Sequence, residues 1–282
     1  MSRRLINYYF SGGYNLEPET IATVARMTTP PTSAQLYDYD YLIKSIKLGQ
    51  SLAIGTNNLS TIFDVLYNRA AHDAQAALLN WAKNAHDSTT VNSPTFTTDR
   101  GYKSNGTTSY LNWNFNPATQ STAAAGAFSA GGYVVENPTR GNKAIFGSQS
   151  GAGGSPANSV TLRIFPRNAS DLATFHSTQS TGAAAGSITN TDMRAFYTVS
   201  RQSTTRVSRK DAISVTSTGI GQDNYITGQN IFELATNLDG TATFFLDGSV
   251  AFTYWGFETS INRVTLMSSI RTYLTIKGIT GI

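Results

Sequence analysis

The sequence predicts a mainly β protein, a large sandwich with N-terminal helices and a C-terminal helix. From Pro94 onward, short runs of aromatic and β-branched residues alternate with clusters of Gly, Ser, Asn and Pro, which is the pattern of strands and loops in a sandwich. Near both ends, apolar residues recur every three or four positions, as in amphipathic helices. Because 40% of the 282 residues are hydrophobic and 11% are aromatic, the chain can bury a sizeable core.

Residues 1–33 are predicted to form an irregular N-terminal arm. Glycine and proline residues within this segment set turns and stop regular elements, and helical spacing begins only after Ser33. We therefore divide the chain into the arm and one domain, residues 34–282, in which helices precede the sandwich.

Three helical stretches are predicted before the sandwich and one after it. Ser33 is a candidate N-cap for the first helix and Ser260 for the last, since a serine hydroxyl can accept a hydrogen bond from the first turn. The third stretch is rich in Ala and Leu. The four predicted stretches are 34–48, 62–67, 70–81 and 261–274.

Strands are predicted for the aromatic and β-branched runs that follow. Segments 119–132 and 147–159, rich in small uncharged residues, are interpreted as loops. The pairs Asp239-Gly240 and Asp247-Gly248 are interpreted as two turns joining three strands between residues 232 and 257, because Asp-Gly favours hairpin turns. The other predicted strands are 110–115, 133–135, 143–146, 160–165 and 195–199.

Composition excludes several classes of function. The chain has no Cys, and therefore no disulfide, thiolate metal site or cysteine nucleophile. We expect no secretory signal, no membrane insertion, and synthesis in a cytoplasm as a soluble protein. The net charge is only +4, and the basic residues are scattered, so no nucleic-acid partner is predicted. The densest basic group is Arg201, Arg206, Arg209 and Lys210.

Several segments resemble a module that is common in bacteriophage virion proteins. They occur in a specific order from about Leu16 to the C-terminus. The segments are Ala25–Pro31, Leu66–Trp81, Val91–Tyr102, Gly106–Leu111, Asn114–Pro117, Ala235–Gly240, Asp247–Phe252 and Leu266–Leu274.

The resemblance implies a concanavalin A-like, or laminin G-like, jelly-roll sandwich displayed on a phage particle, in a tail, fibre, collar or head-decoration position. Because such folds host lectins, hydrolases and structural modules alike, it does not by itself define the activity. The implied partners are other virion proteins and copies of the same chain, with residues 1–33 as the candidate anchor.

Catalytic and metal-binding patterns are weak. His72-Asp73 and His86-Asp87 are interpreted as packing and loop residues, and no metalloprotease spacing is present. A glycan hydrolase of this fold would need paired carboxylates on one strand, and Glu is sparse. Asp239 and Asp247 are interpreted as turn residues and not as calcium ligands, so no metal or cofactor is predicted. Four aspartates could still serve as the acids of a hydrolase, and they keep that interpretation as an alternative. They are Asp171, Asp192, Asp211 and Asp223.

Glycan recognition is the strongest positive alternative to a purely structural role. A sugar presents an apolar face and a rim of hydroxyl groups, and it needs an aromatic platform with polar groups beside it. We therefore expect a non-enzymatic virion structural protein, with a lectin-like module for host surface glycans as the alternative and a glycan hydrolase as the third possibility. The candidate glycan-binding residues are Trp113, Asn112, Asn114, Tyr254 and Trp255.

Overall fold

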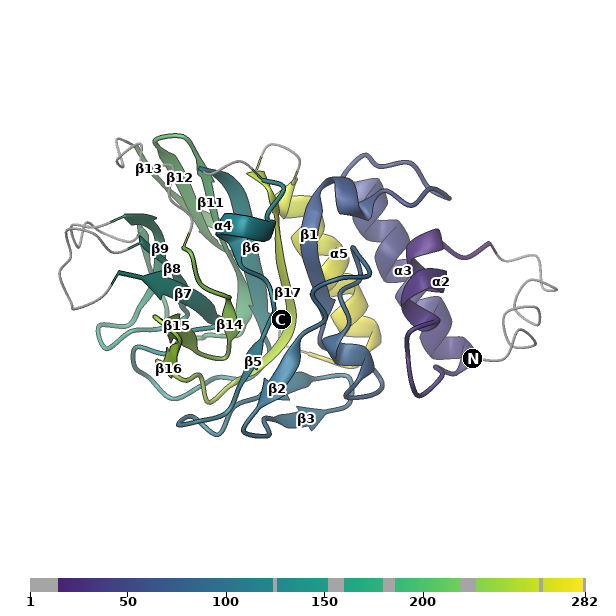
Figure 1. Cartoon of the computed structure of the whole chain (residues 1–282), viewed down its shortest axis with the longest axis horizontal. Helices are drawn as coiled ribbons and strands as arrows, with labels where there is room; N and C mark the ends of the chain where they lie inside the picture. The colour runs from purple at the N-terminus through teal and green to yellow at the C-terminus, as the bar shows by residue number, and fades with distance from the viewer. Residues whose placement is uncertain are drawn as a thin grey trace.

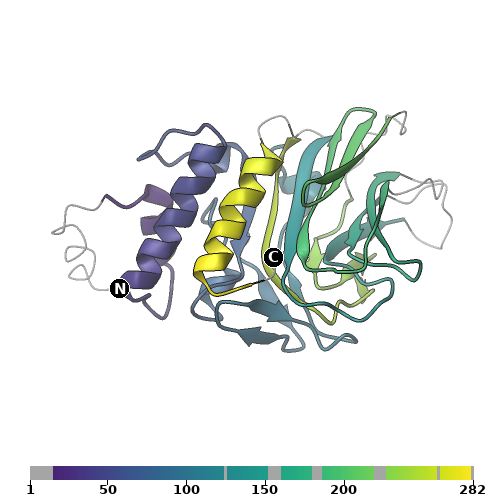
Figure 2. The ribbon, with the colours of Figure 1, turned by 180° about the vertical axis from the view of Figure 1, so that it is seen from behind.

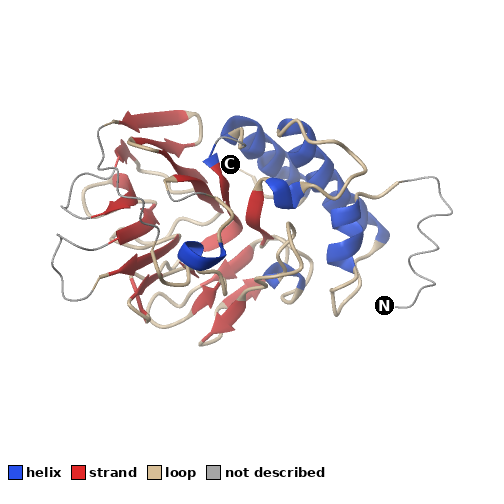
Figure 3. Cartoon of the chain, turned by 45° about the horizontal axis from the view of Figure 1, so that its top comes forward, coloured by secondary structure: helices blue, strands red, loops and turns tan. Residues whose placement is uncertain are grey.

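Two β-sheets and a group of helices are stacked in three layers, in the order helices, sheet A, sheet B (Figures 1 and 2). This computed structural model describes residues 15–123, 126–151, 160–179, 186–218, 227–258 and 261–280. Strands and helices occupy opposite ends of the molecule (Figure 3). The predicted mainly β sandwich with N-terminal helices and a C-terminal helix is confirmed.

Sheet A is the middle layer, and its pairings in the described residues are antiparallel. Strand β1 (Phe63–Asn68) joins it by pairing with β17. In spatial order the other strands are β13 (Ile213–Ser217), β12 (Thr205–Lys210), β11 (Ala195–Gln202), β6 (Ala127–Val134), β17 (Ser249–Phe257), β4 (Gly101–Lys103) and β3 (Thr95–Thr97).

Sheet B is the outer layer. A short hairpin of β15 (Thr236–Leu238) and β16 (Thr241–Thr243) joins it, with β15 parallel to β7. The other strands in spatial order are β10 (Gly186–Thr189), β9 (Leu172–Gln179), β8 (Val160–Phe165), β7 (Phe146–Ser150), β14 (Phe232–Glu233), β5 (Tyr110–Asn112) and β2 (Thr89–Val91).

Small residues in β6 and β7 belong to strands, contrary to the predicted loops 119–132 and 147–159. A Cβ atom on Gly131 would lie 2.6 Å from Cε1 of Tyr254 and 2.7 Å from the carbonyl oxygen of Tyr197. Aromatic residues of the neighbouring strands fill this space, so the strand between them needs glycine. Residues 152–159 of the second segment lie outside the described residues.

The two helices predicted at 62–67 and 70–81 are wrong. Residues Phe63–Asn68 form β1, and all six are buried, so neither face of the strand produces a polar alternation. Residues 70–81 form turns with one 3-10 segment, Ala76–Leu78. The Asp73 carboxylate accepts hydrogen bonds from the backbone of Gln75 and Ala76, and this local capping competes with a continuous helix.

The Asp-Gly pairs differ from each other. Asp239 and Gly240 have φ values of 46° and 91°, as a two-residue hairpin turn requires, and they join β15 to β16 as predicted. Asp247-Gly248 does not close a hairpin, because β17 pairs in sheet A while β16 pairs in sheet B. The Asp247 carboxylate instead accepts hydrogen bonds from Thr139 and Lys143.

Two long helices cover the face of sheet A that points away from sheet B (Figure 2). Helix α3 (Ser33–Gly49) agrees with the prediction, although its N-cap is Thr32, which forms a capping box with Gln35. Helix α5 (Arg263–Ile276) is capped by Asn262, and the predicted cap Ser260 lies outside the described residues. A single turn, α4 (Pro117–Gln120), follows β5.

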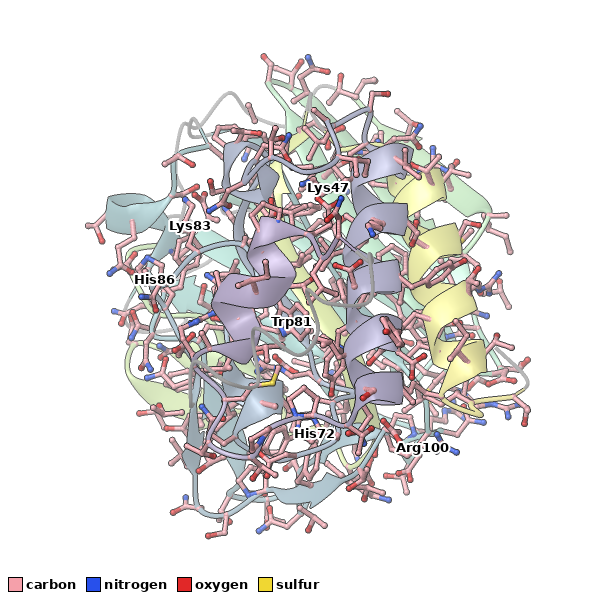
Figure 4. The ribbon with its side chains drawn as sticks, turned by 90° about the vertical axis from the view of Figure 1, so that its right-hand side faces the viewer. Lys47, His72, Trp81, Lys83, His86 and Arg100 are labelled. Atoms are coloured by element: carbon pink, nitrogen blue, oxygen red, sulfur yellow. The ribbon has the colours of Figure 1, made fainter. Side chains whose placement is uncertain are left out.

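The segment before α3 is not irregular throughout, because Pro18–Val24 form helix α2. Glu17 and Glu19 are buried with Lys47 of α3, whose Nζ lies 2.6 Å and 3.2 Å from their carboxylates. Lys47 lies where α2 meets α3 (Figure 4). Residues 1–14 lie outside the described residues, and the anchoring role of residues 1–33 stays a prediction.

A buried ion pair connects the two sheets. Nη2 of Arg69, which follows β1, lies 2.7 Å from the Glu233 carboxylate on β14, and both side chains are fully buried. Glu233 also accepts hydrogen bonds from Trp113 Nε1 of sheet B and Thr253 Oγ1 of sheet A. These bonds satisfy the carboxylate in the core.

Candidate functional site

The aromatic residues predicted to bind glycans lie in the core. Trp113, Tyr254 and Trp255 are each 0% exposed. The Trp113 ring packs against Tyr67 and Phe146. A sugar can stack only on an accessible ring face, so the platform expected of these three residues is wrong for this structure.

Tyr254 and Trp255 also point in opposite directions, as neighbours in a strand do. Tyr254 donates or accepts a hydrogen bond with Ser129 on the helical side of sheet A. Trp255 lies between the sheets, where it stacks on Phe128 at 4.4 Å and donates from Nε1 to Ser121 Oγ. Consecutive aromatic residues in a buried strand therefore cannot form one platform.

Asn112 and Asn114 are partly exposed. Asn112 belongs to β5, and its Oδ1 accepts the backbone N–H of Asn114 at 2.9 Å. Asn114 has a φ of 50° and donates from Nδ2 to the carbonyl oxygen of Asp87. Asn114 is thus used to fix the loop, whereas Asn112 lies on the outer side of sheet B.

The two His-Asp pairs form structural contacts on the helical side. His72 Nδ1 lies 2.7 Å from Tyr39 Oη, and its Nε2 lies 3.0 Å from the carbonyl oxygen of Thr29. His86 Nδ1 lies 3.0 Å from the carbonyl oxygen of Asn114. Both imidazoles tie loops to this end of the fold (Figure 4), in agreement with their interpretation as packing and loop residues.

The remaining acids and bases singled out in the sequence are spread over the molecule. Asp192 pairs with Arg194, and Asp211 pairs with Arg271. Asp171 pairs with two arginines, and Asp223 lies outside the described residues. Arg201 and Arg206 are buried and face each other across β11 and β12, so these two do not form a solvated basic patch. In the residues that the structure describes, no group of three or more His, Asp or Glu side chains is arranged to hold a metal.

The outer side of sheet B carries the side chains that are left available. Strand register places six residues opposite one another on consecutive strands, and residues directly opposite in a sheet share a face. We call this line the outer row. It consists of Thr89, Asn112, Phe232, Gly147, Arg163 and His176.

The helices lie on the far side of sheet A, so they do not cover the outer row (Figures 1 and 2). With strands about 4.8 Å apart, six residues extend over about 24 Å. None of the six is a carboxylate. Thr89 is exposed and Asn112, Arg163 and His176 are partly exposed, whereas Phe232 and Gly147 in the middle of the row are buried. The accessible side chains therefore lie toward the two ends of the row.

An aromatic cluster lies at the β8–β9 end of the outer row. The rings of Phe165 and Phe244 are 5.3 Å apart, and Phe165 meets the His176 ring at 5.7 Å. The Arg163 guanidinium lies 4.9 Å from the Phe165 centroid and 5.0 Å from the Phe244 centroid. The cluster thus combines apolar rings, a cation and an imidazole within one contact network.

Phe244 is the exposed member of the cluster, with 36% of its surface accessible. Its φ of 56° lies in the left-handed region, which is unfavourable for a bulky residue. Its carbonyl oxygen accepts a hydrogen bond from the backbone of Ala144. The fold therefore holds an exposed ring in a strained conformation, a combination that is typical of ligand sites.

Polar groups of the cluster keep unused hydrogen-bonding capacity. The imidazole of His176 forms no hydrogen bond with any residue that the structure describes. Burial, Arg163 and Arg206 together lower the pKa of His176 to about 3, so the ring is neutral at neutral pH. Within the same described ranges, Arg163 Nε and the buried Thr236 Oγ1 have no hydrogen-bond partner.

Gly147 brings two of these groups together. A Cβ atom at this position would lie 2.7 Å from Arg163 Cβ and 2.9 Å from Thr236 Oγ1. Only glycine leaves the space for both side chains to pack over β7.

Sequence reasoning missed this site except for Asn112. Its residues come from seven strands and a loop and extend over about 155 positions, from Thr89 to Phe244, and no motif joins them. Strand 160–165 was predicted, but only the structure shows that Arg163 lies on the side opposite to the buried Leu162 and Ile164. The exposed, strained Phe244 next to the 241–243 strand had no recognisable signal.

No family model and no curated protein matches this chain. A solved mutant of Trypanosoma rangeli sialidase displaying trans-sialidase activity is similar to 86% of the chain, at a TM-score of 0.51 and 9% identity. The match covers 40% of that sialidase, so the chain spans well under half of its length. At this identity the likeness shows the fold alone.

Two further solved structures are more distant. Domain 4 of an extracellular GH43 arabinanase from Geobacillus stearothermophilus, in complex with arabinotriose, matches 73% of this chain and 98% of its own, with a TM-score of 0.49 and 11% identity. The CBM40 domain of a Ruminococcus gnavus IT-sialidase, bound to alpha2,3 sialyllactose, matches 52% of this chain and 82% of its own, with a TM-score of 0.39 and 11% identity. None of the three is a virion protein, and the expected phage setting stays a prediction.

In the described part of the chain, no helix has both the length and the apolar character to cross a bilayer.

Proposed function

We propose that this chain is a non-enzymatic glycan-binding module that holds carbohydrate on the outer row of sheet B. The observation that carries the proposal is the exposed ring of Phe244, which a strained backbone holds beside the partly exposed Arg163 and His176. An aromatic face and adjacent donors and acceptors are what a sugar ring requires. The alternative expected from sequence, a lectin-like module, is thus favoured, but through different residues.

The site supports binding better than hydrolysis. The outer row lacks a carboxylate, whereas glycoside hydrolysis ordinarily uses a pair of carboxyl groups on either side of the bond. The neutral imidazole of His176 and the charged guanidinium of Arg163 can donate hydrogen bonds to sugar hydroxyl groups. They do not supply a pair of carboxyl groups. We therefore propose that the chain binds glycans without hydrolysing them.

The test is binding to an array of immobilised glycans that includes lactose, sialyllactose and arabinotriose. Phe244→Ala should lose most binding, since it removes the exposed ring. Tyr41→Ala is the matched control, because Tyr41 is a 42% exposed aromatic residue on α3, at the other end of the molecule. Equal binding by wild type and Phe244→Ala, or no binding by the folded wild type, would overturn the proposal.

The virion setting rests on the sequence resemblance alone. In that setting, the module would be displayed on a phage particle, with residues 1–33 contacting other virion proteins and copies of the chain forming a homo-oligomer. A density map of intact phage particles would locate the chain. If the chain were absent from the particle, the virion location would be ruled out, while the proposed glycan site would be unaffected.

A further inference from the structure

Arg163 differs from most of the arginines that the structure describes in having no acidic partner. Within the described ranges, its Nη1 donates to Gln149 Oε1 at 3.2 Å, and no Asp or Glu forms an ion pair with it. Seven other arginines each meet a carboxylate. They are Arg26, Arg69, Arg140, Arg167, Arg194, Arg263 and Arg271.

The surroundings of Arg163 hold its charge in place without neutralising it. Phe165 and Phe244 contact the guanidinium from within 5.0 Å of their centroids, and contact with a ring face leaves the N–H groups in the guanidinium plane available. Its Nε has no acceptor among the residues described. Nε itself is shielded from solvent. Nη2 forms no hydrogen bond with a described residue and is not shielded in this way, so an incoming anion would find an unused donor there.

The local field is positive. The charges that act on His176 are those of Arg163 and Arg206, and both disfavour a proton on its ring. Arg206 is fully buried on β12 of sheet A, so an anion on the outer row would meet the Arg163 guanidinium and a neutral imidazole. Thr236 Oγ1 packs beside Arg163 over Gly147 and is fully buried, so it supports the position of the Arg163 side chain from below.

We propose that Arg163 binds the carboxylate of an acidic sugar, so that the outer row selects glycans containing uronic or other carboxylated residues over neutral ones. The proposal rests on the glycan-binding function proposed above and names its ligand class. A guanidinium fits a carboxylate because two parallel N–H groups match its two oxygens. Phe244 would contact the apolar face of a sugar ring, while the partly exposed His176 would meet a hydroxyl group.

The test uses ligands that differ only in the carboxylate. Oligosaccharides of polygalacturonate and hyaluronan are titrated into the full chain beside their carboxyl-reduced forms, and a sulfated oligosaccharide forms a third arm. We expect wild type to bind the acidic form about 10- to 100-fold more tightly, as for hydrogen bonds to a charged group. Arg163→Gln should abolish this preference, so that the acidic and the reduced forms bind this variant with equal affinity.

Two variants control for charge and geometry. Arg194→Gln lowers the net charge by the same unit but removes an arginine already paired with Asp192, and its preference should equal that of wild type. Arg163→Lys keeps the positive charge but lacks the two parallel N–H groups of the guanidinium, so it should retain only part of the preference for the acidic form. Thermal unfolding of each variant verifies that it is folded.

The outcomes separate the two proposals. If acidic and neutral forms bind wild type equally, or if folded Arg163→Gln keeps the preference, the carboxylate assignment is wrong and the glycan-binding function stands. If the sulfated ligand binds as well as the carboxylated one, the site is a general anion site and the carboxylate assignment is overturned. If no form binds, both proposals fail.

Discussion

The helical side and the outer row contain similar polar residues that are used in opposite ways. On the helical side, Lys47 lies among the carboxylates of Glu17 and Glu19, so its buried charge is compensated. On the outer row, Arg163 lies between two aromatic rings without an acid. Compensated charges hold elements together, whereas uncompensated groups next to an exposed ring are available to a ligand.

The comparison predicts its largest effect on the helical side. Lys47→Met leaves the carboxylates of Glu17 and Glu19 buried without a cation, and we expect a loss of about 3–5 kcal/mol in the free energy of unfolding. Urea unfolding measures this loss. Lys103→Met is the matched control, because Lys103 and Glu136 are both nearly half exposed, and exposed pairs contribute about 0–1 kcal/mol. Similar losses in the two variants would contradict the comparison.

A smaller effect is expected from the strained backbone at Phe244. Phe244→Gly and Phe244→Ala both remove the ring, but only glycine adopts a φ near 56° without steric cost. We expect the glycine variant to be more stable than the alanine variant by about 1 kcal/mol, the difference between the left-handed penalty and the entropy of glycine. Differential scanning calorimetry of the pair checks this, and an alanine variant of equal or greater stability would refute stored strain.

The smallest effect concerns the protonation of His176. In wild type its pKa is about 3, lowered by burial first and by Arg163 and Arg206 next. Arg163→Gln removes one of the two cations, so the pKa should rise, while Arg194→Gln should leave it unchanged. Imidazole chemical shifts followed over a pH titration measure both. A pKa that does not rise in Arg163→Gln would show that Arg163 does not act on this ring.

The same shift fixes the sign of the pH dependence. In the unfolded chain His176 has a pKa near 6.5, above its folded value, so the unfolded state binds more protons between pH 3 and 6.5. This residue therefore lowers stability as the pH falls through that window, and Arg163→Gln should narrow the window.

The fold was more predictable from sequence than the site because its main signals are local. Apolar periodicity located α3 and α5, and the Asp239-Gly240 turn located the β15–β16 hairpin. Prediction failed at β1, where burial of both faces removes the polar alternation that distinguishes a strand from a helix.

The site was not predictable because it depends on which face each side chain takes and on pairing between distant strands. Trp113 and Trp255 were chosen for their rings, but both point into the sandwich. Arg163 lies beside His176 only because β8 pairs with β9 in one register, and a shift of one residue would turn it inward. The pairing register of distant strands cannot be predicted from the sequence of any single segment.

A crystal structure of the chain with a uronic-acid oligosaccharide would test the central claim most directly. The account predicts the sugar on the outer row, with one ring against Phe244 and its carboxylate on the guanidinium of Arg163. A sugar bound on the helical side, or elsewhere on the chain with the outer row empty, would contradict it.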